Sequence, residues 1–259
     1  MTRHHELRGY PYEILGLQPG DALEDVLTVY AERSDAAPTS KSEVLRVQSP
    51  DGAVFEFTYQ LFTRIGDVGI NGRLAKAAQD QVTATLSSDV MQQRPMAIHR
   101  NLIQPSDELP EPLELRAQIE ETYGPPSRVQ ISGREMTLTY AWSTEGFIDD
   151  LDALGPITHE EERTFSGRTS TSITEYEICG SARHYRSDVT YQFEYPRDKE
   201  IKPGCLATFT VSYRGDPGIT SIGFSLVDYE LGRMHMEELD RQIINALTDE
   251  EVEASDMDL

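Results

Sequence analysis

The sequence predicts an α+β protein made of two tandem repeats, each a helix followed by a four-stranded antiparallel sheet. A helix signal that begins after Gly20 recurs in the stretch that ends at Gly124. Each helix signal is followed by segments in which apolar and polar residues alternate. Alternation with period two is typical of strands that have one buried and one solvated face. An inserted loop and a C-terminal helix complete the predicted layout.

The first helix is predicted to begin after the Pro19–Gly20 turn. Asp21 can accept a hydrogen bond from the first-turn amides, and Glu24 stands three residues later, as in a capping box. The residues expected on its buried face follow helical spacing: Leu23, Val26, Leu27 and Tyr30.

Two hairpins are predicted to follow. In the first, residues 42–48 and the alternating strand around Phe57 flank the turn at Ser49–Gly52, where glycine accepts a positive φ. In the second, the flanking strands are marked by Val82, Ala84 and Leu86 and by Met96, Ile98 and Leu102. Arg100 is then expected to point into the core and His99 away from it, because successive strand residues face opposite sides.

The second helix is predicted from Pro112 to Tyr123. Proline suits the first helical position because its missing amide costs nothing there, and Gly124-Pro125-Pro126 ends the helix. The strands predicted after it are 136–142, 189–195, 207–213 and 222–226, the last two joined by the turn Gly215–Gly218.

The predicted domains are residues 1–104 for the first repeat and 111–247 for the second. Residues 143–179 are interpreted as an inserted loop or a partly ordered excursion, because their apolar spacing follows neither a helix nor a strand. A closing helix is predicted over 231–247. The acidic residues of 248–259 predict a solvated, disordered tail.

The charge balance argues against several partners. With 45 acidic and 23 basic residues the net charge is -22, so the chain repels phosphate backbones and anionic lipids, and we expect neither nucleic acid nor membrane insertion. No apolar run approaches the roughly 18 residues of a membrane span. The basic N-terminus is not followed by the apolar core of a signal peptide. We therefore expect a cytoplasmic protein, or a periplasmic or secreted one if a leader is missing from this sequence.

The two cysteines allow two interpretations. A bridge between Cys179 and Cys205 stabilises by about 3 kcal/mol in the chain-entropy picture; the alternative is two buried free thiols in a reducing compartment. Neither cysteine has a second ligand spaced beside it, and His159 begins a zinc-protease motif in which Arg163 replaces the second histidine. We expect no metal and no cofactor.

Two stretches resemble a pattern of bacterial envelope proteins. These are Gly16-x-x-x-Gly20-Asp-Ala-x-Glu-Asp-Val26 and Ile119-x-x-x-Tyr123-Gly124-Pro125-Pro126-Ser127. The group includes the small outer-membrane lipoproteins of the barrel-assembly machinery and the β-lactamase inhibitory proteins, and the late cysteine pair is similar to uncharacterised proteobacterial secreted proteins. The resemblance implies tandem helix-plus-sheet repeats whose concave sheet face grips a partner protein. No functional residue of the inhibitors matches, so we do not predict β-lactamase binding.

The candidate binding residues are aromatic and basic. Aromatic strand residues are expected in the core, with an exposed binding face as the alternative, and a basic island surrounds His184. The candidates are Tyr59, Tyr140, Trp142, Tyr191, Arg183 and Arg186.

These observations favour a non-catalytic binding protein with a protein partner. The sequence holds no Gly-x-Ser-x-Gly elbow and no phosphate-binding glycine loop. Two alternatives stay open: a hydrolase that combines carboxylates with His99 or His159, and a structural subunit of a larger assembly.

Overall fold

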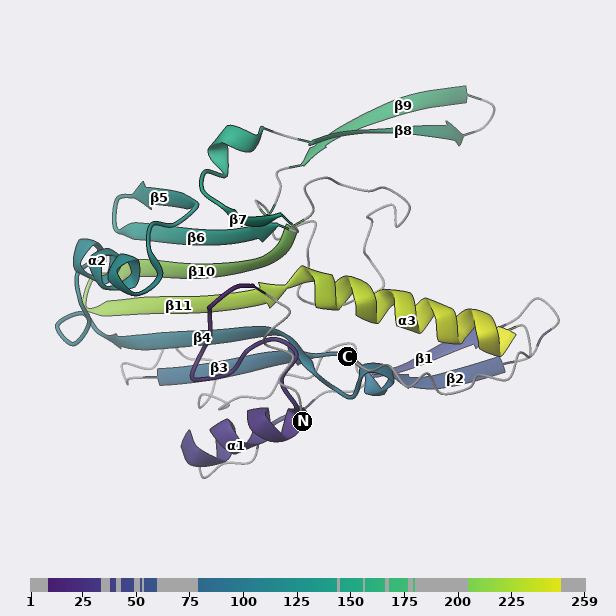
Figure 1. Cartoon of the computed structure of the whole chain (residues 1–259), viewed down its shortest axis with the longest axis horizontal. Coiled ribbons are helices and arrows are strands. Elements are labelled where there is room, and N and C mark those ends of the chain that lie inside the picture. Colours follow the sequence, from purple (N-terminus) through teal and green to yellow (C-terminus); the bar gives the residue numbers. More distant parts are fainter. Residues whose placement is uncertain are drawn as a thin grey trace.

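A seven-stranded antiparallel sheet forms the main layer of the protein, as seen in a computed structural model (Figure 1). The strands lie in the order β3–β4–β11–β10–β6–β5, and β7 pairs with β6. They are β3 (Gln79–Leu86), β4 (Pro95–Pro105), β5 (Arg128–Ser132), β6 (Glu135–Ser143), β7 (Gly146–Ile148), β10 (Cys205–Asp216) and β11 (Ile219–Asp228). The structure describes residues 9–33, 38–40, 43–48, 52, 54–59, 79–143, 145–155, 157–165, 168–176, 179 and 205–247.

Helices and two separate hairpins accompany this sheet, which confirms the α+β fold class. The helices are α1 (Leu23–Arg33), α2 (Pro112–Tyr123) and α3 (Tyr229–Leu247), with short 3-10 turns η2 (Asp89–Met91) and η3 (Asp152–Leu154). The hairpins are β1 (Glu43–Gln48) with β2 (Val54–Tyr59), and β8 (Ile157–Phe165) with β9 (Arg168–Tyr176). Within the described ranges, no helix is both long and apolar enough to cross a membrane.

The finer prediction of two repeats, each with its own four-stranded sheet, is not confirmed. Strands β3 and β4 come from the first predicted repeat, yet β4 pairs with β11 from the second along nine residue pairs from Ile219–Pro105 to Val227–Ala97. Strands β1 and β2 pair with each other as a separate two-stranded sheet. Period-two alternation identifies strands, but which strands pair depends on which apolar faces can be buried together. One shared sheet buries the apolar faces of the strands from both halves of the chain against a single core.

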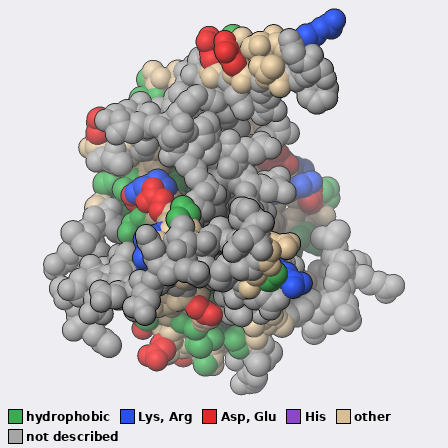
Figure 2. Space-filling view, turned by 90° about the vertical axis from the view of Figure 1, so that its right-hand side faces the viewer, with side chains coloured by type: hydrophobic (Ala, Val, Ile, Leu, Met, Phe, Trp, Pro, Cys, Tyr) green, Lys and Arg blue, Asp and Glu red, His purple; other side chains and the backbone are tan. Residues whose placement is uncertain are grey.

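The predicted inserted loop, 143–179, is wrong in its secondary structure. It contains β7, η3 and the hairpin β8–β9, which projects from the sheet (Figure 1). Figure 2 shows acidic side chains at this upper end of the molecule, and Glu160, Glu162 and Ile173 are all exposed. Exposed side chains need no apolar alternation, so the sequence carried no strand signal here even though the backbones pair.

The predicted helices begin and end close to the expected residues. Pro112 is the first residue of α2, and Gly124 ends it with a φ of 79°, in the region that favours glycine. The capping of α1 differs from the prediction, because the Gln18 amide donates to Asp21 and the Ala22 amide donates to Asp25 rather than to Glu24.

The buried face of α1 is narrower than predicted. Val26 and Tyr30 are buried, whereas Leu27 is 40% exposed. The Tyr30 hydroxyl donates to the carbonyl of Val82 and so fixes the helix to β3. One residue can therefore leave the predicted apolar face without loosening the helix.

Both predicted hairpins of the first half are present. Strands β1 and β2 pair with Gln48 opposite Val54, and Gly52 between them has a φ of 93°. Strands β3 and β4 pair antiparallel across η2. The predicted strand 189–195 and the predicted tail 248–259 lie outside the described residues.

An aromatic cluster centred on Tyr12 fills the core face of the sheet. The Tyr12 ring lies 5.0 Å from Phe209, 5.4 Å from Tyr140 and 5.3 Å from Tyr123, measured between centroids. Tyr12 belongs to the N-terminal segment (purple in Figure 1), which lies on the sheet between its strands and solvent. Burial raises the pKa of Tyr12 despite the hydrogen bond from Trp142, so this hydroxyl stays protonated in the core.

Polar contacts fix α3 to the end of the sheet. Asp228 accepts a hydrogen bond from the Leu231 amide (2.6 Å) and another from the Tyr10 hydroxyl (2.8 Å). His235 is 0% exposed, and its Nε2 accepts a hydrogen bond from the Ser88 amide (3.0 Å) beside η2. The Ser88 hydroxyl lies 2.8 Å from the same nitrogen. This pairing requires an unprotonated Nε2.

A disulfide joins Cys179 to Cys205, with the Cα atoms 5.4 Å apart. It lies in a second, smaller apolar cluster with Ala141, Ile148 and Leu151. The bridge therefore ties the chain after β9 to the first residue of β10.

Reduction of this disulfide should lower the free energy of unfolding by about 3 kcal/mol, because the bridge closes a loop of sequence separation 26. Urea unfolding with and without reductant measures the change. The double variant Cys179→Ser with Cys205→Ser serves as the control, because reductant should leave its unfolding curve unchanged. Thiols that react with iodoacetamide in the unreduced, unfolded protein would contradict the bridge.

Acid should destabilise the fold through His235. Burial lowers the pKa of His235 from 6.5 to about 4, so between these pH values the unfolded chain binds a proton that the folded chain does not. Stability is therefore present above pH 6.5 and is lost as the pH falls towards 4, by about 3 kcal/mol. The variant His235→Gln lacks this titrating group, so it should be spared this loss. As the pH falls from 7 to 4, the free energy of unfolding of the wild type should therefore decrease by about 3 kcal/mol more than that of His235→Gln.

Urea unfolding of the wild type, His235→Gln and His99→Gln at several pH values makes this measurement. His99 is the matched control because it is not fully buried. Parallel pH profiles for the wild type and His235→Gln would show that the prediction is wrong.

Candidate binding site

The two faces of the seven-stranded sheet differ in chemistry. Residues such as Ile98, Leu226 and Val211 face the aromatic core and are 0% exposed. Their sequence neighbours on the same strands point to the opposite face, because strand side chains alternate. On that face the central strands carry mainly hydroxyl, amide and imidazole groups. We call it the polar face.

Two rows of side chains cross the polar face, as the strand registers define them. The first, called the His99 row, consists of Thr83, His99, Ser225, Thr210 and Thr139. The second, called the Asn101 row, consists of Gln81, Asn101, Gly223, Ser212 and Thr137. Each row runs over β3, β4, β11, β10 and β6. Neither row contains a carboxylate, although the chain as a whole has a net charge of -22.

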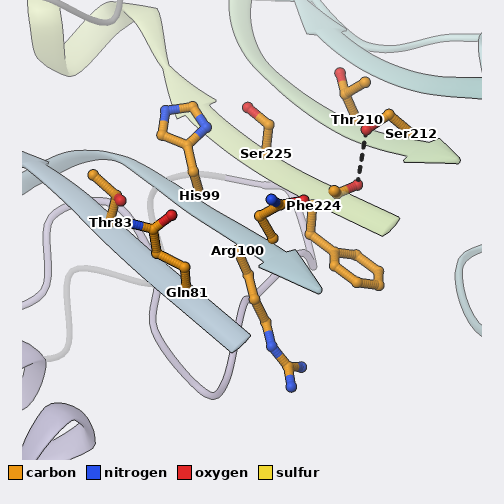
Figure 3. Close-up of a pocket in the computed structure, with 10 residues that line it drawn as sticks. Gln81, Thr83, His99, Arg100, Thr210, Ser212, Phe224 and Ser225 are labelled. Carbon is orange, nitrogen blue, oxygen red and sulfur yellow. Dashed lines mark hydrogen bonds between the residues drawn. The ribbon is translucent and has the colours of Figure 1, made fainter. Parts of the chain in front are cut away.

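A hollow of about 330 Å³ opens over these rows (Figure 3). The residues that line it are Gln81, Thr83, His99, Arg100, Asn101, Thr210, Ser212, Gly223, Phe224 and Ser225. Figure 3 shows the His99 and Ser225 side chains on one side of the sheet and the Arg100 and Phe224 side chains on the other. Arg100 and Phe224 therefore border the hollow without pointing into it.

Arg100 is held on the opposite side by an ion pair. Its Nε and Nη2 lie 2.9 and 2.7 Å from the Asp80 carboxylate, which also pairs with Arg33 of α1. Burial alone raises the pKa of Asp80, but the hydrogen bonds and charges of Arg100 and Arg33 outweigh it, so the pKa lies below its usual value. The predicted inward direction of Arg100, with a carboxylate partner, is thus found.

Neighbouring groups hold several lining residues in place. The Ser221 hydroxyl donates to Asn101 Oδ1 at 2.9 Å, which orients the Asn101 amide. Gly223 lies in the middle of the hollow, and a Cβ built there meets Ser212 Oγ at 2.6 Å. A glycine inside a central strand often marks a close approach of another group. Here the approaching group is the Ser212 hydroxyl, which donates to the Gly223 carbonyl at 3.4 Å.

The sequence-predicted binding residues are not brought together at this hollow. Tyr140 is 0% exposed, and its hydroxyl donates to the Gly124 carbonyl, so its proposed role as a surface contact is wrong. Trp142 is half-buried and donates to the Tyr12 hydroxyl at 3.2 Å. Tyr59 is the last residue of β2, and its side chain lies outside the described part of the chain. The other predicted residues outside that part are Tyr191, Arg183 and Arg186.

Sequence reasoning missed the lining residues for an identifiable reason. The apolar members of each strand predict its buried face, whereas the polar residues between them match no motif, and His99 alone among the lining residues is a sequence candidate, as part of the hydrolase alternative. Thr210 and Ser212 alternate with core residues of β10, as His99 and Asn101 do in β4. The runs of Ser, Thr, Asn and His at alternate positions were a usable signal, but the strand order was needed to join them.

The remaining chemistry of the described residues is limited. Among them, no three His, Cys, Asp or Glu side chains are grouped so that they could hold a metal ion. His159 lies in β8, with its side chain outside the described part. The hollow therefore offers hydrogen bonds as its main means of recognition.

Comparisons with known proteins leave the site without a relative: no family model, no curated protein and no solved structure matches the chain.

Proposed function

We propose that the protein is a non-catalytic binding protein that holds a protein partner on the polar face of its sheet. The proposal is carried by one observation, the two aligned rows of hydroxyl, amide and imidazole groups with a hollow that opens over both of them. Such groups both donate and accept hydrogen bonds. Protein interfaces carry about one hydrogen bond per 100–200 Å², and the rows provide the density of polar groups that this requires.

The support beneath the rows favours binding. Four of the five strands that carry them, β4, β11, β10 and β6, are paired on both sides in the order of the sheet, and β3 lies at its edge. Beneath them lie core residues such as Leu226 and Val211, each 0% exposed. A surface that is ordered before binding loses little conformational entropy when the partner arrives. This support favours the sheet face over a loop as the contact surface.

The disulfide between Cys179 and Cys205 supports an oxidising location for the protein. A periplasmic or secreted bacterial protein is therefore part of the proposal. The resemblance to the β-lactamase inhibitory proteins also implies a sheet face that grips a partner protein. The disulfide bears on the compartment in which the protein works, and the resemblance bears on the use of a sheet face. The groups that would contact the partner are those of the polar face.

Lysines placed on the polar face should abolish capture of the partner. The test uses the double variant Thr210→Lys with Ser225→Lys, because two long charged side chains fill the hollow and add unpaired charge. Immobilised wild type and variant are exposed to extract of the source organism, and bound proteins are quantified by mass spectrometry. We expect the variant to lose at least tenfold of the partner, about 1.4 kcal/mol of binding free energy.

The matched control adds the same charge to the opposite side of the molecule, with Gln118→Lys and Thr122→Lys on exposed positions of α2. This control should retain the partner, and thermal unfolding should show that both variants are folded. Equal capture by the two variants, or no protein enriched by the wild type, would refute the proposal.

A further inference from the structure

We infer that the hollow on the polar face takes a neutral saccharide unit. The inference rests on the proposed function, because it treats this face as a binding surface, and it goes further by naming the chemistry of what enters the hollow. Three properties of the lining lead to it: the kinds of polar group, the separation of charge from the hollow, and the size of the cavity.

The polar groups match those of a sugar. Each sugar hydroxyl both donates and accepts, and so do the lining hydroxyls of Thr210 and Ser225, while the Ser212 hydroxyl donates to the Gly223 carbonyl and can accept from a ligand. The side-chain amide of Gln81 places a donor beside an acceptor, which suits two adjacent ring hydroxyls, and Asn101 adds an amide donor whose direction Ser221 sets. A ligand with hydroxyls on several ring positions can thus engage groups from β3, β4, β10 and β11 at once.

Among the lining residues that the structure describes, no arginine, lysine or carboxylate side chain points into the hollow. Of the lining residues that the structure describes, Arg100 has the one guanidinium group, and it is turned to the other side of the sheet and paired with Asp80. The next charged group along β10, Arg214, lies 3.6 Å from Glu135 and 3.5 Å from Asp216. A charged ligand would lose hydration without meeting an opposite charge from any carboxylate, lysine or arginine of the described lining, whereas a neutral polyol meets matching hydrogen bonds.

The cavity has the size and order of a small-ligand site. Its volume of about 330 Å³ lies at the small end of the range of roughly 300–1,000 Å³ for ligand pockets. The Ser221 hydroxyl occupies Asn101 Oδ1 and so sets the direction of the Asn101 amide hydrogens before any ligand arrives. A fixed amide distinguishes between sugar epimers, because a misplaced hydroxyl leaves a buried donor unpaired.

The test is direct binding of saccharides to the purified full-length chain. An array of neutral oligosaccharides identifies the best ligand, whose Kd is then measured by isothermal titration calorimetry. Citrate and spermidine are titrated as anionic and cationic comparators. We expect at least one neutral saccharide to bind with one-to-one stoichiometry, and the two comparators to show no binding.

Variants assign the binding to the hollow. Asn101→Leu with Thr210→Val removes polar groups from both rows and should weaken the saccharide Kd at least tenfold. Gln118→Leu with Thr122→Val, on α2, should leave the Kd unchanged; circular dichroism checks that both variants fold. No binding to any saccharide on the array, binding of a comparator instead, or equal Kd values for the two variants would overturn the inference.

The result is separable from the test of the proposed function. If the array is blank while the lysine variant still loses the protein partner, the saccharide inference fails and the proposed function stands. If a saccharide binds in the hollow while the lysine variant captures the protein partner as well as the wild type does, the proposed function fails and the saccharide site stands.

Discussion

The strict alternation of side chains along the central strands is the constraint on which the rest of this structure depends. Because Val211 must face the core, Thr210 and Ser212 must face the other way, and the same holds for His99 and Asn101 around Arg100. Pairing β3, β4, β11, β10 and β6 in fixed register then converts alternate positions into continuous rows. The core and the candidate site are thus two consequences of one geometry.

The aromatic core holds this register through tertiary contacts. Tyr12 stacks on Phe209 and touches Tyr140, so the N-terminal segment is fastened to β10 and β6. Tyr10 donates to Asp228, which also caps α3. The N-terminal segment, the end of β11 and the start of α3 therefore share one buried carboxylate. A one-residue slip of β11 would bury its hydroxyls and expose its apolar set, at a cost far above the contribution of any single hydrogen bond.

Local signals predicted much of the fold, while contacts distant in sequence were beyond them. Pro112 and Gly124 marked the ends of α2 because their backbone constraints are local, and period-two alternation marked β3, β4, β6, β10 and β11. The pairing of β4 with β11 was missed because periodicity carries no information about neighbours. Hairpin β8–β9 was missed because its sequence shows no apolar alternation, and those of its side chains that the structure describes are exposed. Both limits apply to the candidate site. Its polar residues can be seen in the sequence of each strand, but only the order of the strands shows that they lie next to one another.

The absence of carboxylates, lysines and arginines from the two rows bears on the kind of recognition that the polar face can perform. A chain of net charge -22 would be expected to attract basic partners over its whole surface. The rows instead place ten positions without a carboxylate across five strands, and the arginine that borders them is turned away and neutralised by Asp80. Long-range charge can then act on the surroundings of the protein as a whole, while recognition of the proposed ligand would depend on short-range hydrogen bonds. Since hydrogen bonds depend on direction and charges mainly on distance, this division favours specificity over a broad attraction to cations.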